Sequence, residues 1–256
     1  MQDLETRSNW TPVPILMLHA VFPDARPEFP INLQVTHNDI ASHLAILKRW
    51  GYTGITFETL AAALRYGSPL PRRPVIITFD DGFDGLLKAH PIFEAARFPY
   101  TIFVVAACVG KTNSWDRSHN IPELPLLSWE AIAELDRSEF VSVQPHTLTH
   151  PSLPELNSRE AENEIAGSKA RLEDRLGKEA TVFCYPYGHY NDETVRIVRQ
   201  AGYACAVTMD RGRVRQDEDL FRLPRISVQH RPFFSLSKGF ASIEFVRRLR
   251  YSQDRR

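Results

Sequence analysis

The stretch VIITFDDG, residues 75–82, decides how this chain is expected to fold. Its first five residues are apolar or β-branched, which is typical of a strand buried on both faces of a sheet. The run ends in Asp80 and Asp81, followed by Gly82, which allows the backbone to turn sharply. Carboxylates at the carboxyl end of a buried strand lie where barrel enzymes build their active sites. The alternative is an acidic helix start, in which an aspartate caps the next helix.

Strand-like apolar runs alternate with helical patterns on both sides of this stretch. Strands are expected at 13–19, 54–57, 75–79, 100–106, 140–143, 182–185, 204–208 and 226–228. Helices are expected at 36–50, 60–66, 85–96, 129–135, 158–176 and 192–201. Such alternation implies a parallel sheet, which we expect to close into a barrel. The long loop at 110–125 is the best candidate for a functional excursion.

Composition and charge narrow the class of protein. The chain has 256 residues, with 31 Lys+Arg and 31 Asp+Glu, so it lacks the basic surplus typical of proteins that bind nucleic acid or anionic membranes. Cys108, Cys184 and Cys205 form no CxxC pair, which indicates neither a disulfide framework nor a thiolate zinc site. The polar stretch 1–10 carries no signal pattern, and no apolar run is long enough to span a bilayer. We therefore expect a soluble, cytoplasmic protein without a membrane span, exported only if a signal segment was removed.

A second polar cluster, HTLTH at 146–150, follows the strand expected at 140–143. Two histidines four residues apart lie on one face of a helical turn, which suits a shared metal ion, although surface pairs at this spacing are common. Two neutral imidazoles and one carboxylate make a three-ligand site with open positions for water and substrate. Such a site is hydrolytic rather than structural, and the second aspartate is left free to act as general base.

Two further features add to this picture. In FCYPYG, residues 183–188, proline and glycine break a strand between aromatic residues. Such a break can aim a backbone N–H into a cavity, and Tyr187 offers that donor, although a plain strand-ending turn fits as well. Trp115, in the loop at 110–125, could contact a bound substrate with its ring or pack against other apolar residues.

In this order and at these separations, TFDDG, HTLTH and YPYG resemble the motifs of the polysaccharide deacetylase family, with its NodB homology domain. The resemblance spans roughly residues 13–230. It implies an irregular (β/α)7-type barrel and one divalent ion, most often zinc, with Co²⁺, Ni²⁺ or Fe²⁺ as alternatives. We expect one catalytic domain at 13–240, between an N-terminal extension at 1–12 and a basic C-terminal tail at 241–256. Within that tail, the basic run from Arg247 to Arg256 is expected to be solvated.

The resemblance also assigns roles to individual residues. Asp80 maps onto the catalytic base, and the ion ligands map onto Asp81, His146 and His150. Tyr187 maps onto the residue whose backbone N–H helps to hold the oxyanion.

Two positions depart from the usual pattern of the family. The third motif usually reads Arg-x-Pro-Tyr, but Cys184 stands at the arginine position, and Arg225 is the candidate replacement because it starts a late strand. Most members carry a Leu-x-His motif near the C-terminus for the general acid, whereas here His230 lacks the apolar context. The run LMLH, ending at His19, has that character at the start of the chain, as in the circularly permuted branch that includes the poly-N-acetylglucosamine deacetylases. We therefore assign His19 as general acid over a core histidine, and Asp210 could orient an acid or face solvent.

The expected reaction is hydrolysis of an N-acetyl group on an amino sugar, with an N-acetylated sugar as partner and no nucleic acid. One alternative is a metal-dependent amidohydrolase that acts on a small amide outside glycans. Another is a catalytically weakened, glycan-binding barrel, which the missing arginine motivates. A structural metalloprotein is disfavoured, because three ligands leave the ion open.

Overall fold

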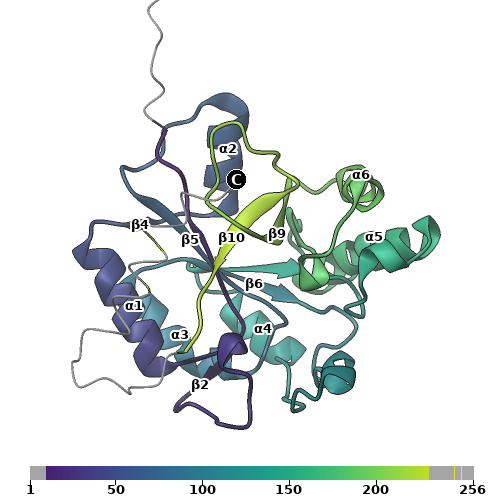
Figure 1. The fold of residues 1–256 in the computed structure, drawn as a ribbon, viewed down its shortest axis with the longest axis horizontal. Coiled ribbons are helices and arrows are strands. Elements are labelled where there is room, and N and C mark those ends of the chain that lie inside the picture. The colour runs from purple at the N-terminus through teal and green to yellow at the C-terminus, as the bar shows by residue number, and fades with distance from the viewer. Residues whose placement is uncertain (1–9, 231–244, 246–248, 250–256) are drawn as a thin grey trace, which may run out of the picture.

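The computed structural model describes residues 10–230 together with Phe245 and Leu249. An eight-stranded parallel sheet forms its centre, in the order β7-β6-β5-β1-β10-β9-β8, with β4 paired to the start of β5. The strands are β1 Ile15–Leu18, β4 Thr53–Gly54, β5 Pro74–Phe79, β6 Tyr100–Val104, β7 Val141–Pro145, β8 Val182–Cys184, β9 Cys205–Arg211 and β10 Leu223–Ser227. Strands β1 and β10 lie side by side, so opposite ends of the described chain meet in the middle of the sheet (Figure 1).

Helices surround this sheet on its outer side (Figure 1). They are α1 His37–Arg49, α2 Phe57–Tyr66, α3 Gly85–Ala96, α4 Trp129–Leu135, α5 Ser158–Leu176 and α6 Asp192–Gln200. The side chains of Thr36, Asn157 and Asn191 accept a hydrogen bond from the first turns of α1, α5 and α6, which satisfies backbone donors that have no partner within the helix. The irregular (β/α)7-type barrel predicted from the sequence is confirmed.

The sheet is nearly closed, and a side chain spans its seam. The two end strands, β7 and β8, lie side by side without a ladder of backbone hydrogen bonds. The side-chain oxygen of Gln144 accepts the backbone N–H groups of Thr181 and Val182, at 2.9 and 3.0 Å. This glutamine is buried, and it satisfies two donors that a neighbouring strand would otherwise meet.

Alternate residues of the strands pack on opposite sides of the sheet. Ile15, Ile76, Cys184 and Leu223 belong to a buried cluster inside the barrel. Their neighbours in sequence, such as Ile77, pack in a different cluster with residues of α1 and α3. Because side chains alternate along a strand, positions two residues further along face the interior as well. This alternation selects the side chains that enter the site.

Some local predictions needed correction. The strand predicted at 54–57 is wrong beyond Gly54, because the Thr56 hydroxyl accepts the Thr59 N–H and caps α2, which begins at Phe57. A short parallel pair, β2 Ala20–Phe22 and β3 Gln34–Thr36, was not predicted. Short 3₁₀ helices η1 Ile31–Leu33, η2 Ser114–His119, η3 Leu153–Glu155 and η4 Pro186–Gly188 complete the described elements.

The ends of the chain were expected to flank a domain at 13–240. Within the predicted tail, Phe245 and Leu249 are buried in the cluster that lies under α1. The expectation that the run from Arg247 to Arg256 is solvated is therefore wrong at Leu249. The rest of that tail, and residues 1–9, lie outside the described part of the chain. Among the residues that the structure describes, no helix is both long and apolar enough to cross a membrane.

Candidate active site

Alternate side chains of each strand face the interior of the barrel. Polar residues from several strands therefore meet at the carboxyl ends of the strands. Asp80 directly follows β5, two residues beyond Thr78 and four beyond Ile76, so it continues the inner face of that strand. His19 and His146 come directly after β1 and β7, and Cys184 is the last residue of β8. Asp80 and His146 are buried, and a buried charge such as that of Asp80 is costly unless it pairs with another charge or with a cation.

Asp81, His146 and His150 converge on one point. Their side chains are buried, and the Nε2 atoms of His146 and His150 lie 3.7 and 3.4 Å from Oδ1 of Asp81. A tetrahedral zinc ion with ligands at about 2.0–2.2 Å would hold its ligand atoms about 3.4 Å apart. The spacing therefore fits an ion of this size.

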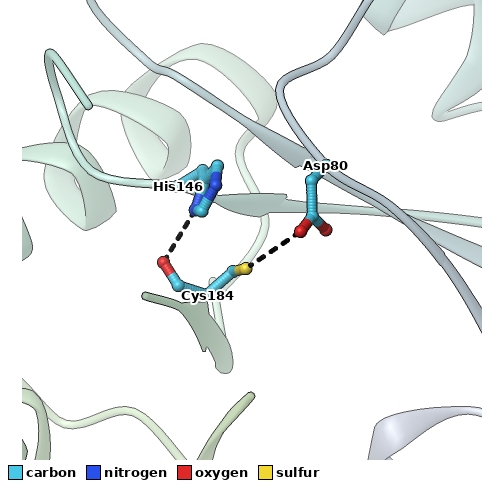
Figure 2. Close-up of side chains that lie close together, drawn as sticks. All are labelled: Asp80, His146 and Cys184. Atoms are coloured by element: carbon cyan, nitrogen blue, oxygen red, sulfur yellow. Dashed lines mark hydrogen bonds between the residues drawn. The ribbon is translucent and has the colours of Figure 1, made fainter. Parts of the chain in front are cut away.

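Hydrogen bonding and burial put these ligands in the state that binds a metal. The Nδ1 of His146 lies 2.8 Å from the carbonyl oxygen of Cys184 (Figure 2) and must donate to it. This leaves the Nε2 lone pair on the side of Asp81. Burial lowers the pKa of His146 to about 4 and that of His150 well below its usual range, so both imidazoles are neutral. Burial and the neighbouring Asp80 charge raise the pKa of Asp81, a penalty that a bound cation would offset.

The two histidines do not lie on a helical turn, and this part of the prediction is wrong. His146 follows the end of β7, and the chain then turns through left-handed backbone at Thr147 and His150, with φ of 64° and 67°. Their ring centroids are 4.8 Å apart, although no helix joins them. The ring of His146 enters the site directly after β7, and the tight turn returns the ring of His150 to the same point.

Arg225 reaches Asp80 from β10, which only β1 separates from β5. Its Nη1 and Nη2 atoms donate to the two carboxylate oxygens at 2.7 and 2.8 Å, and its Nε donates to the carbonyl of Thr208 at 2.7 Å. The Arg225 side chain is fully buried in β10. Burial alone would raise the pKa of Asp80, but the Arg225 guanidinium lowers it below its usual range, so the carboxylate stays ionised.

Cys184 contacts both the Asp80–Arg225 pair and the expected metal ligand His146. Its Sγ is 3.7 Å from Oδ2 of Asp80 and 3.3 Å from Nη2 of Arg225, while its carbonyl faces His146 (Figure 2). Asp80, His146 and Cys184 also offer ligand atoms within 4.8 Å of one another. Because Arg225 occupies both oxygens of Asp80, the set that contains Asp81 is the better ion site.

The capping alternative for the aspartates is wrong. Helix α3 begins at Gly85, its N-cap is Asp84, and that side chain makes no capping hydrogen bond. Both residues of the Asp80-Asp81 pair point into the barrel site instead. Asp81 itself adopts a left-handed φ of 70°, so the chain turns within the motif as well as at Gly82.

The predicted general acid also lies beside the carboxylate. The Nε2 of His19 is 3.9 Å from Oδ2 of Asp80, and its Nδ1 has no hydrogen-bond partner among the described residues. Burial lowers the pKa of His19, and the Asp80 charge opposes this shift. Asp210 is exposed and accepts a hydrogen bond from the Tyr190 hydroxyl at 2.6 Å, so of its two alternatives it faces solvent. His230 pairs with Asp39 at the start of α1, at 2.7 Å.

Two aromatic residues flank His150. The Trp115 ring, from η2 in the predicted excursion, stacks on the imidazole with centroids 4.8 Å apart and an angle of 26° between planes. The Tyr187 ring meets it edge-on at 4.6 Å, from a residue with a left-handed φ of 57°. Both side chains are partly exposed, so they form an aromatic wall on the solvent side of the triad of Asp81, His146 and His150.

Sequence reasoning missed Glu164, a buried carboxylate of α5 that contacts the loop between the histidines. The available signal was its position one residue before the core residue Ile165 on an amphipathic helix.

Comparison with known proteins gives consistent matches. A family model described as polysaccharide deacetylase matches residues 67–206. YxkH of Bacillus subtilis (strain 168) is 27% identical over 236 residues, 92% of this chain and 77% of its own length. The poly-β-1,6-N-acetyl-D-glucosamine N-deacetylase of Staphylococcus epidermidis is 27% identical over 216 residues, 81% of this chain and 72% of its own. The structure of the Streptococcus pyogenes deacetylase PplD in complex with acetate superposes with a TM-score of 0.74 and 26% identity, over 86% of this chain and 94% of that one.

Proposed function

The chain belongs to the polysaccharide deacetylase family, and from this we propose that it is a metal-dependent hydrolase that removes N-acetyl groups from an amino-sugar glycan or glycoconjugate and releases acetate. The observation that carries the proposal is the placement of Asp80, ionised and fixed by Arg225, beside the buried set of Asp81, His146 and His150.

Asp81, His146 and His150 would hold the ion, for which Zn²⁺ fits the nitrogen-rich donor set best, with Co²⁺, Ni²⁺ and Fe²⁺ as alternatives. When bound, such an ion acidifies a water molecule and polarises the acetamide carbonyl. The backbone N–H of Tyr187 is assigned to the oxyanion that develops as the carbonyl is attacked.

Asp80 accepts the proton of the attacking water as general base. Arg225 holds both carboxylate oxygens, so the base keeps one orientation and stays ionised near neutral pH. This contact supports a working enzyme over a weakened, glycan-binding barrel, because an arginine reaches Asp80 although position 184 is a cysteine. His19, 3.9 Å from Asp80, protonates the departing amine, so that free amine and acetate leave.

The aromatic wall supports a sugar as substrate. Trp115 and Tyr187 present partly exposed rings beside His150, and aromatic faces of this kind stack on the apolar faces of sugar rings. The Staphylococcus epidermidis relative is named for poly-β-1,6-N-acetyl-D-glucosamine, which makes N-acetylglucosamine oligomers the first substrates to test.

The test is acetate release from N-acetylglucosamine oligomers by the purified protein, before and after chelation and again after addition of zinc. We expect chelation to abolish release and zinc to restore it. A parallel arm with small cyclic amides separates the glycan from the amidohydrolase alternative. Release that is indifferent to chelation, or turnover of the cyclic amides alone, would contradict the proposal.

A further inference from the structure

Glu164 lies outside the three motifs, yet it contacts the loop that carries both histidines. One of its oxygens, Oε2, accepts the backbone N–H groups of Leu148 and Thr149 at 2.8 and 2.9 Å. The other, Oε1, accepts the Thr149 hydroxyl at 2.6 Å. Two consecutive N–H groups pointing at one anion form a backbone nest, and here the anion is a side chain of the protein itself.

The same loop is tied on its other side to the residues that follow β6. The N–H groups of Ala106 and Ala107 donate to the carbonyls of Thr147 and Leu148, at 3.0 and 2.9 Å. The loop therefore sits between a row of donors and one carboxylate. Glu164 is 9% exposed, so its charge is balanced by these hydrogen bonds rather than by water.

The turn that Glu164 stabilises is a strained one. Thr147 and His150 both have left-handed φ angles, which cost energy for residues other than glycine and persist only where the surroundings impose them. Helix α5 packs against the side chain of Leu148 in this loop, since a Cβ at Gly167 would lie 2.8 Å from Cδ1 of Leu148. This contact brings Glu164, one turn earlier on α5, against the loop.

We propose that Glu164 is a positioning residue, which holds the 146–150 loop in the shape that aims both histidines at Asp81. The inference rests on the proposed function, because it takes the triad to be a metal site. Glu164 touches neither the ion site nor the reacting atoms, so it acts through the loop backbone. Partners that orient metal ligands commonly account for about 10- to 100-fold in metal affinity.

The experiment measures the zinc dissociation constant by competition with a chelator, at a temperature where each variant is folded. We expect Glu164→Ala to weaken zinc binding by about 10- to 100-fold. Glu164→Gln should stay near the wild-type affinity, because its oxygen can accept both N–H groups and its amide can donate to the Thr149 hydroxyl. That rescue separates hydrogen bonding from charge.

Two controls come from the same helix. Glu162→Ala changes an exposed carboxylate, and Ile165→Val lowers the melting temperature through the core without touching the loop, so both should keep the wild-type zinc affinity. If Glu164→Ala does not fold, Thr149→Val, which removes the hydroxyl contact alone, should weaken zinc binding by a smaller factor.

An unchanged zinc affinity in Glu164→Ala, or in Thr149→Val where the alanine variant is unfolded, would overturn the proposal. An equal loss in Ile165→Val would overturn it as well. Wild-type protein that binds no zinc would instead contradict the proposed function itself, and this shows in the first measurement.

Discussion

The active site has two halves that differ in how their buried charges are balanced. The base half consists of Thr78, Asp80, Cys184 and Arg225, and the ligand half of Asp81, His146 and His150. In the base half, Asp80 lies against Arg225, which also donates to Thr78 and contacts Cys184. Each carboxylate oxygen has a partner within the protein, and the bidentate pairing fixes the orientation of the group. Charge here is neutralised by the chain alone.

In the ligand half, Asp81 faces two imidazoles that burial keeps neutral. Burial and Asp80 raise the pKa of Asp81, and the Nδ1 of His150 has no hydrogen-bond partner among the described residues. A bound cation would balance the charge of this half. The difference teaches that the protein balances the charge of the base half by itself, whereas the rest of the fold must offset the cost of burying the ligand half.

The largest effect is expected from Arg225→Met, which removes the positive charge that balances Asp80 in the base half. Removing one partner of a buried ion pair costs about 3–5 kcal/mol, because the other charge stays buried and unpaired. The free energy of unfolding, from denaturant titration, should fall by that amount, and deacetylation should fall with it. Arg222→Met is the matched control: its ion pairs with Asp192 and Asp219 are at the surface and are worth about 1 kcal/mol or less. Equal losses in the two variants would contradict the comparison.

The second prediction separates the halves by function. Asp80→Asn removes the base but none of the expected ligands, so kcat should fall by about 10²–10⁴-fold while the zinc dissociation constant stays close to that of the wild type. Calorimetry and acetate release measure the two quantities on the same preparation. Undiminished kcat would remove Asp80 from its assigned role, and a large loss of zinc affinity would mean that the halves are not separable.

Much of the fold could be predicted because it depends on local patterns. The buried run at 75–79 and the amphipathic pattern at 158–176 lie where they were expected, as β5 and α5. The strand predicted at 54–57 failed because Thr56 is a good cap, and capping favoured helix over the weak preference of two apolar residues for a strand.

The site was predictable where motif and strand end coincide, and less so where a contact joins distant segments. Asp81, His146 and His150 each come soon after a strand that was predicted from the sequence. Because the carboxyl ends of parallel strands lie at one end of a barrel, these residues could be expected to converge. The Arg225–Asp80 contact spans 145 positions in sequence and was named only because position 184 lacked an arginine. Glu164 belongs to none of the motifs, and the sequence has no glycine at the left-handed turn at Thr147 that would indicate it.

The smallest expected effect concerns the unbalanced half. Asp81→Asn removes a buried charge that has no cation in the metal-free protein, and asparagine tolerates the left-handed φ of 70° at this position. We expect the metal-free variant to unfold with a free energy about 0.5–2 kcal/mol higher than the wild type, the usual gain when a costly functional site is relaxed. Zinc at about 100 times its Kd should then stabilise the wild type by about 2.7 kcal/mol and leave the variant unchanged. Thermal melts with and without zinc measure both terms. A variant less stable than the metal-free wild type would show that Asp81, like Asp80, is balanced by the protein alone, and the contrast between the two halves would not hold.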